Sequence, residues 1–166
     1  NPDPANRKIL DTLRDDYSVV ITNALPLPPL LDGFCQVKPD FVKGGRLATA
    51  HLLEKGHRRI GYFTWEITTS SLNTRFKGYM EALEEKGLPV DFSIIKATTG
   101  LNREEDWRAL EELLRLPDPP TAIACANDSR ALHILEYCRA HGIRVPRDLA
   151  VTGFDNVPES AFSLPP

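Results

Sequence analysis

The hydrophobic positions along the chain follow two alternating patterns, one with helical spacing and one made of short continuous apolar runs. Apolar residues that recur three or four positions apart predict amphipathic helices. We expect these helices around residues 4–15, 47–54, 76–83, 107–114 and 131–138. Short runs rich in apolar and β-branched residues predict strands. These runs are residues 19–22, 60–65, 93–97, 121–126 and 149–153.

The expected strands lack the polar alternation of a half-exposed sheet, which indicates that both of their faces are buried. Helices separate them along the chain, as in consecutive β-α-β units with right-handed crossovers. The sequence therefore predicts an α/β fold, a parallel sheet flanked by helices on both faces. The stretch 25–31 is expected to be irregular, because prolines at 26, 28 and 29 remove backbone donors and fix φ.

Composition narrows the class of protein. The net charge is −3, so this chain lacks the strongly basic footprint of a nucleic-acid-binding domain. We find neither an apolar run long enough for a membrane span nor an export leader. Cys35, Cys125 and Cys138 are odd in number and widely spaced, which argues against a disulfide framework or a zinc site. Each is expected to be a small core residue, and the location to be cytoplasmic, with no membrane partner.

In open parallel α/β sheets, ligands bind outside the carboxyl ends of the strands. Four loops follow predicted strands: residues 65–73, 98–102, 126–128 and 153–156. They gather polar side chains at one edge of the sheet. Arg75 in the next helix supplies a cation, Asn127 an amide, and Asp128 and Asp155 carboxylates, beside Trp65, Leu101 and Phe154. Such a mixture suits a hydroxyl-rich ligand, because carboxylates and amides bind hydroxyls while apolar groups pack ring faces.

Each of these residues also has a purely structural interpretation. Asp128 could cap the helix that follows it, and Arg75 could be a solvated helix residue. Asp155 could be an ordinary turn residue after Gly-Phe. His51 is expected to pack in the core and not to bind a metal.

Catalytic motifs are absent from the sequence. There is neither a Gly-x-Ser-x-Gly elbow nor a phosphate-binding loop, and Gly44-Gly45 lacks the remainder of a dinucleotide fingerprint. The histidines have no partners at metal-ligand spacing. We therefore expect no enzyme activity, no cofactor and no metal, although an enzyme on a doubly wound sheet is a distant alternative.

Several motifs occur in a recognisable order. They are Asp40 to Ile60 with Gly44-Gly45 and Gly56-His-Arg-Arg-Ile60, Arg75-Phe-Lys-Gly-Tyr79, Pro119-Pro-Thr-Ala-Ile123, Ala126-Asn-Asp128, and Val145-Pro-Arg-Asp148 leading to Val151-Thr-Gly-Phe-Asp-Asn156. Together they resemble the effector-binding core of LacI/GalR-type transcriptional regulators over essentially the whole chain.

The resemblance implies a type I periplasmic-binding-protein-like fold, in which two subdomains clasp a small effector. Residues 1–40 would end the N-terminal subdomain, and residues 41–166 would form most of the C-terminal one. By motif position, the expected effector contacts are Arg75, Asn127 and Asp155, together with Leu101. The loop 65–73 would line the same cleft and adds Trp65, Ser71 and Asn73 as further candidates. Leu101 stands where the family often has a ring-stacking aromatic residue, so this chain departs from flat stacking there.

The implied function is effector sensing by a bacterial repressor, with a small molecule allosterically controlling operator binding. A sugar is the expected effector ahead of a purine or nucleoside. The family also implies a homodimer, for which residues 157–162 are an interface candidate, and operator DNA bound through a helix-turn-helix that this chain lacks. The alternative is a periplasmic sugar-binding protein of a transport system, which shares the fold.

Overall fold

The computed structural model describes residues 4–22, 34–65 and 74–165, which form two compact units, residues 1–40 and residues 41–166. In the first unit, helix α1 (Pro4–Asp16) precedes strand β1 (Val20–Thr22), which pairs in parallel with strand β2 (Cys35–Val37). Ser71 and Asn73, two of the expected effector contacts, lie outside the described residues.

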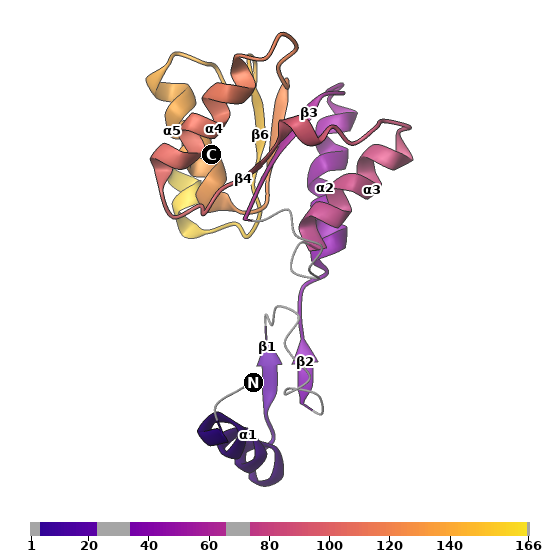
Figure 1. Cartoon of the computed structure of the whole chain (residues 1–166), viewed down its shortest axis with the longest axis vertical. Coiled ribbons are helices and arrows are strands. Elements are labelled where there is room, and N and C mark those ends of the chain that lie inside the picture. Colours follow the sequence, from indigo (N-terminus) through magenta and orange to yellow (C-terminus); the bar gives the residue numbers. More distant parts are fainter. Residues whose placement is uncertain (1–3, 23–33, 66–73, 166) are drawn as a thin grey trace. The chain divides into compact units, whose positions relative to one another are not determined.

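The second unit alternates helices and strands from α2 onward. Its elements are α2 (Phe41–Glu54), β3 (Ile60–Thr64), α3 (Thr74–Glu85), a 3-10 turn (Phe92–Ile94), β4 (Ile95–Ala97), α4 (Arg103–Leu114), β5 (Ala122–Cys125), α5 (Asp128–Ala140), β6 (Ala150–Thr152) and a second 3-10 turn (Pro158–Phe162). The four strands form one parallel sheet in the order β4-β3-β5-β6. Helices α2 and α3 cover one face, and α4 and α5 cover the other (Figure 1). The predicted fold class is confirmed.

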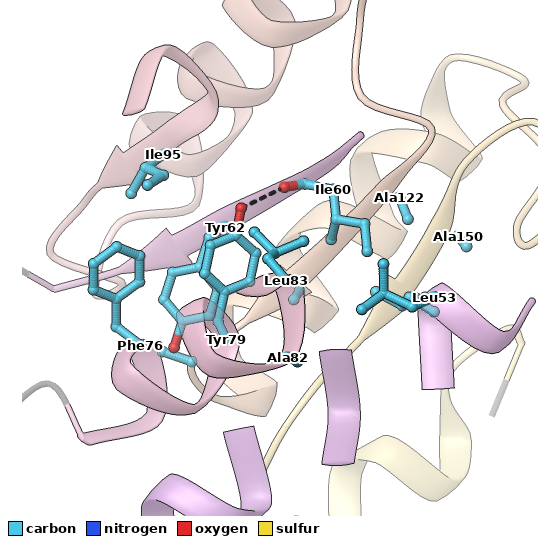
Figure 2. Close-up of a cluster of buried hydrophobic side chains, with 13 residues drawn as sticks. Leu53, Ile60, Tyr62, Phe76, Tyr79, Ala82, Leu83, Ile95, Ala122 and Ala150 are labelled. Carbon is cyan, nitrogen blue, oxygen red and sulfur yellow. Dashed lines mark hydrogen bonds between the residues drawn. The ribbon is translucent and has the colours of Figure 1, made fainter. Parts of the chain in front are cut away.

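Alternate residues of each strand serve the two faces, because successive side chains of a strand point in opposite directions. Tyr62 packs with Phe76 and Tyr79 beneath α3 (Figure 2), while Phe63 faces α4 and α5. The Tyr79 hydroxyl donates to the carbonyl of Ile60 at 2.8 Å, which satisfies its polar end in the core.

Two glycines bring α2 and α3 into backbone contact. A Cβ at Gly45 would lie 2.1 Å from the carbonyl oxygen of Arg75, and one at Gly78 would lie 2.0 Å from that of Val42. No side chain fits at either point. This close approach fixes where α3 lies relative to α2. It therefore also fixes the position of Arg75 in the first turn of α3.

The structure corrects several details of the sequence prediction. Strand β2 was not predicted, because its three residues are all exposed and give no apolar run. The expected strand 93–97 begins as a 3-10 turn, since Asp91 accepts a bond from the backbone N–H of Ser93 at 2.8 Å. His51 is exposed and not in the core, because it falls beside the buried stripe of α2. Cys35 is likewise exposed, whereas Cys125 and Cys138 are buried as expected.

Candidate functional site

Arg75 joins the ends of two strands. Its Nη1 donates to the carbonyl oxygen of Ala126, just after β5, at 2.6 Å. Its Nη2 donates to Oδ1 of Asp155, just after β6, at 2.8 Å. The Arg75 side chain is only 14% exposed, and that of Asp155 is 40% exposed. The solvated interpretation of Arg75 is therefore wrong, and one outer part of the Asp155 carboxylate remains accessible.

Three aromatic rings surround the Arg75 guanidinium. Its Cζ lies 4.0 Å from the ring centroid of Phe154, 4.7 Å from that of Phe41 and 5.8 Å from that of Trp65. Cations are attracted to ring faces at these distances, and the rings restrict the side chain. Burial lowers the pKa of Arg75 and raises that of Asp155, while each residue's charge opposes the shift of the other. The pair is thus a partly desolvated donor and acceptor held in place.

The backbone at Asp155 adopts a conformation that side chains rarely take. Its φ is 103°, and Asn156 follows with φ 54°. Backbone strain of this kind costs about 1–3 kcal/mol per residue and persists where surrounding contacts impose it. Here the imposing contacts are the Arg75 ion pair and a bond from the N–H of Asp128 to the Phe154 carbonyl at 2.8 Å. The conformation turns the carboxylate toward Arg75.

The helix cap after β5 is Asn127 and not Asp128. Asn127 has extended backbone angles, and its Oδ1 accepts from the backbone N–H of Arg130 at 3.4 Å. Asp128 is instead the first residue of α5, is buried, and accepts from the N–H of Val157 at 2.8 Å. Its carboxylate lies where a Cβ on Gly153 would fall, so β6 and α5 meet closely.

Arg130 is a buried cation that the sequence prediction missed. Its side chain is fully buried and donates to Thr98 Oγ1 at 3.1 Å, to the Thr98 carbonyl and to Asn127 Oδ1 at 3.2 Å. The guanidinium also lies 4.7 Å from the ring centroid of Trp65. One signal could have revealed it, because Arg130 falls on the apolar stripe that includes Ile134 and Tyr137.

The predicted effector contacts do not all lie together in the structure. Trp65, Asn127 and Asp155 follow strand ends at one sheet edge, and Arg75 in the first turn of α3 reaches the same edge. Trp65 lies within ring contact of Arg75 and Arg130. We call Arg75, Asn127, Asp155 and Trp65 the strand-end site. Leu101 is 92% exposed on the loop after β4.

The described residues offer no metal site, since no three His, Cys, Asp or Glu side chains among them come together. None of the helices in the described ranges has the length and hydropathy that a membrane span requires. What the strand-end site offers is hydrogen bonding beside aromatic surface.

Comparisons with known proteins identify relatives of the chain. Residues 49–166 match the model of the family described as periplasmic binding protein-like domain. The chain is 32% identical to the HTH-type transcriptional repressor PurR of Mannheimia succiniciproducens over 160 residues, covering 92% of this chain and 48% of that protein. It is 35% identical to the PurR repressor of Haemophilus influenzae over 123 residues, covering 74% and 36%. The chain therefore spans about half the length, or less, of these curated relatives.

Solved structures agree with this grouping. A LacI-family regulatory protein from Chloroflexus aggregans superimposes with a TM-score of 0.79 at 29% identity, over 96% of this chain and 56% of that one. A LacI-family regulator from Lactobacillus casei with bound sucrose has a TM-score of 0.79 at 21% identity, over 94% and 57%, and supports the fold alone. The resemblance to LacI/GalR-type regulators is confirmed.

Proposed function

The chain belongs to the periplasmic-binding-protein-like domain family, and from that premise we propose that it is part of the effector-binding region of a LacI-type transcriptional repressor. The observation that carries the proposal is the Arg75–Asp155 pair, a partly desolvated donor and acceptor held at the carboxyl edge of a parallel sheet. Relatives that are repressors favour this function over a transport system's binding protein or an enzyme.

The proposed mechanism is a shift between two conformations of the whole protein. An effector that binds one conformation more tightly changes their populations by its differential affinity, typically about 1–3 kcal/mol. The protein that contains this chain would bind operator DNA through a separate helix-turn-helix and act in the cytoplasm. This chain supplies one side of the effector cleft.

The effector is proposed to be a small polar ring compound. A sugar is our first candidate, because hydroxyls both donate to a carboxylate such as Asp155 and accept from an amide such as Asn127. The PurR repressors among the relatives favour a purine as the second candidate. Calorimetric titration of the full-length protein with D-glucose, D-ribose, hypoxanthine and guanine distinguishes the sugar candidate from the purine candidate.

Substitutions in the strand-end site test the proposal. Asp155→Ala and Arg75→Ala are each expected to weaken binding of the titrated effector about 100-fold, because hydrogen bonds to charged groups contribute about 1.5–3 kcal/mol each. The control is Asp148→Asn, which removes an exposed carboxylate paired with Arg144 before β6. Affinity that stays at the wild-type value in both site variants would refute the assignment.

We also propose that the protein is a homodimer through the face formed by α5 and the last 3-10 turn. A groove there is lined by Leu132, Leu135, Glu136, Arg139, Glu159, Phe162, Ser163 and Leu164. Phe162 is 87% exposed and Leu164 is 75% exposed, so an apolar surface lies beside charged residues of both signs. Apolar centres with polar rims are typical of interfaces.

Phe162→Glu is expected to weaken the dimer at least about tenfold, because truncation of a central aromatic contact costs about 2 kcal/mol or more. Sedimentation equilibrium of the full-length protein measures the change. Phe92→Glu is the matched control, since Phe92 is also exposed, at 60%, but lies in the other 3-10 turn. Equal dissociation constants for wild type and Phe162→Glu would place the interface elsewhere.

A further inference from the structure

The side-chain oxygen of Asn127 is already occupied by donors. The backbone N–H of Arg130 lies 3.4 Å from Oδ1, and Nη1 of Arg130 lies 3.2 Å from the same atom. Both neighbours can only donate, so the atom facing them must be the amide oxygen. The amide nitrogen, with two N–H donors, is consequently the end of the carboxamide that points away from Arg130.

Arg130 is itself held from several sides. Thr98 accepts two of its bonds through the side-chain and main-chain oxygens, and a Cβ on Gly100 would lie 2.5 Å from Nη1. The side chain is fully buried. Burial lowers the pKa of Arg130, and the negative charge of buried Asp106 opposes that shift. The Arg130 guanidinium is therefore held in one position, in contact with the loop 98–101 and with Asn127.

We propose that Arg130 is a positioning residue that determines specificity, because it fixes the Asn127 carboxamide with its N–H donors toward the effector. This inference rests on the proposed function of the strand-end site. The effector atom opposite Asn127 is then a hydrogen-bond acceptor, such as a hydroxyl, carbonyl or ring oxygen or an unprotonated ring nitrogen. The group opposite Asp155 is a donor.

The donor and acceptor pattern narrows the ligand chemistry. Asp155 accepts, Asn127 donates, and Arg75 donates, so the strand-end site favours a compound with at least one donor and one acceptor on the same edge. If a compound presents only donors to Asn127, a donor of the compound faces an N–H of the Asn127 carboxamide and neither has an acceptor. Such unpaired buried donors are a strong source of discrimination.

Asn127→Asp is the sharpest test, because it replaces the outward donor with an acceptor and keeps the helix cap. The carboxylate can still accept from Arg130, so the thermal midpoint of the full-length protein is expected to be unchanged or higher. Affinity for the best binder among D-glucose, D-ribose, hypoxanthine and guanine is expected to fall at least tenfold. Affinity equal to or above wild type would overturn the proposal.

Arg130→Met separates positioning from simple contact. Methionine fills the space but its side chain donates no bond, so only the longer bond from the backbone N–H of residue 130, at 3.4 Å, still restrains the Asn127 carboxamide. The loss caused by Asn127→Asp is then expected to be several-fold smaller in the Arg130→Met background than in wild type. Purely structural support by Arg130 would leave the two effects independent, and that result would also overturn the proposal.

A measurement without ligand distinguishes failure of this inference from failure of the proposed function. In protein labelled with ¹⁵N-asparagine, the side-chain signal lost in Asn127→Asp identifies Asn127. Coupling constants should show one side-chain rotamer in wild type and averaging in Arg130→Met. If no probe binds wild type but the rotamer result holds, the effector assignment fails and the positioning role survives. An averaged rotamer in wild type would refute the role of Arg130.

Discussion

Gly78→Ala is expected to lower the free energy of unfolding of the unit 41–166 by about 3 kcal/mol. The added Cβ would lie 2.0 Å from the Val42 carbonyl oxygen and 2.5 Å from the backbone nitrogen of Arg46. Both are backbone atoms of α2, so neither can rotate away and the two helices must separate. The gain of about 1 kcal/mol in helix propensity from Gly to Ala is too small to compensate.

Urea denaturation followed by tryptophan fluorescence measures this change, because Trp65 and Trp107 both lie in the second unit. Lys77→Ala is the control on the neighbouring exposed position of α3, where the expected change stays within about 0.5 kcal/mol. If Gly78→Ala were as stable as this control, the close contact between α2 and α3 would be wrong.

His133→Leu is expected to cost about 3 kcal/mol of stability through a buried charge left without its partner. Nδ1 of His133 lies 2.6 Å from Oδ2 of Asp106, and the Asp106 side chain is completely buried. The other carboxylate oxygen, Oδ1, has no hydrogen-bond partner among the residues that the structure describes. Loss of the imidazole therefore leaves this carboxylate without a hydrogen bond from any described side chain.

The matched variant replaces both partners. Asp106→Ala combined with His133→Leu removes the charge together with its partner, and such double replacements are often close to neutral. We expect the double variant to recover most of the stability lost in His133→Leu, measured by the same denaturation. A double variant less stable than the single one would show that Asp106 is held by other groups.

The sequence predicted the general arrangement because it depends on local patterns. Apolar runs and helical spacing determine the strands and helices, and the carboxyl-end rule places loop residues at one edge of a parallel sheet. Arg75 and Asp155 were accordingly expected at the same edge. Their direct ion pair was not, because it joins residues whose separation depends on how α3 packs against α2.

Buried charges were the part that pattern analysis did not reveal. Arg130 and Asp106 lie on apolar stripes of α5 and α4, where polar residues read as interruptions of the pattern. Their partners, Thr98 and His133, are far away in the sequence and become neighbours only when the elements pack. One interpretation of the sequence placed the cap of α5 at Asp128, one residue after its actual position at Asn127. Asn and Asp are equally good helix caps, so residue type does not distinguish the two positions.

The two bonds that Asp128 makes to the segment after β6 have a mechanical consequence. Its N–H binds the Phe154 carbonyl and its carboxylate binds the N–H of Val157, so both sides of Asp155 are fastened to the start of α5. A movement of the Asp155 backbone away from α5 would therefore have to stretch these two bonds to Asp128. The same bonds connect Asp155 to α5 and to the 3-10 turn that carries Phe162, because Val157 is the residue that precedes this turn.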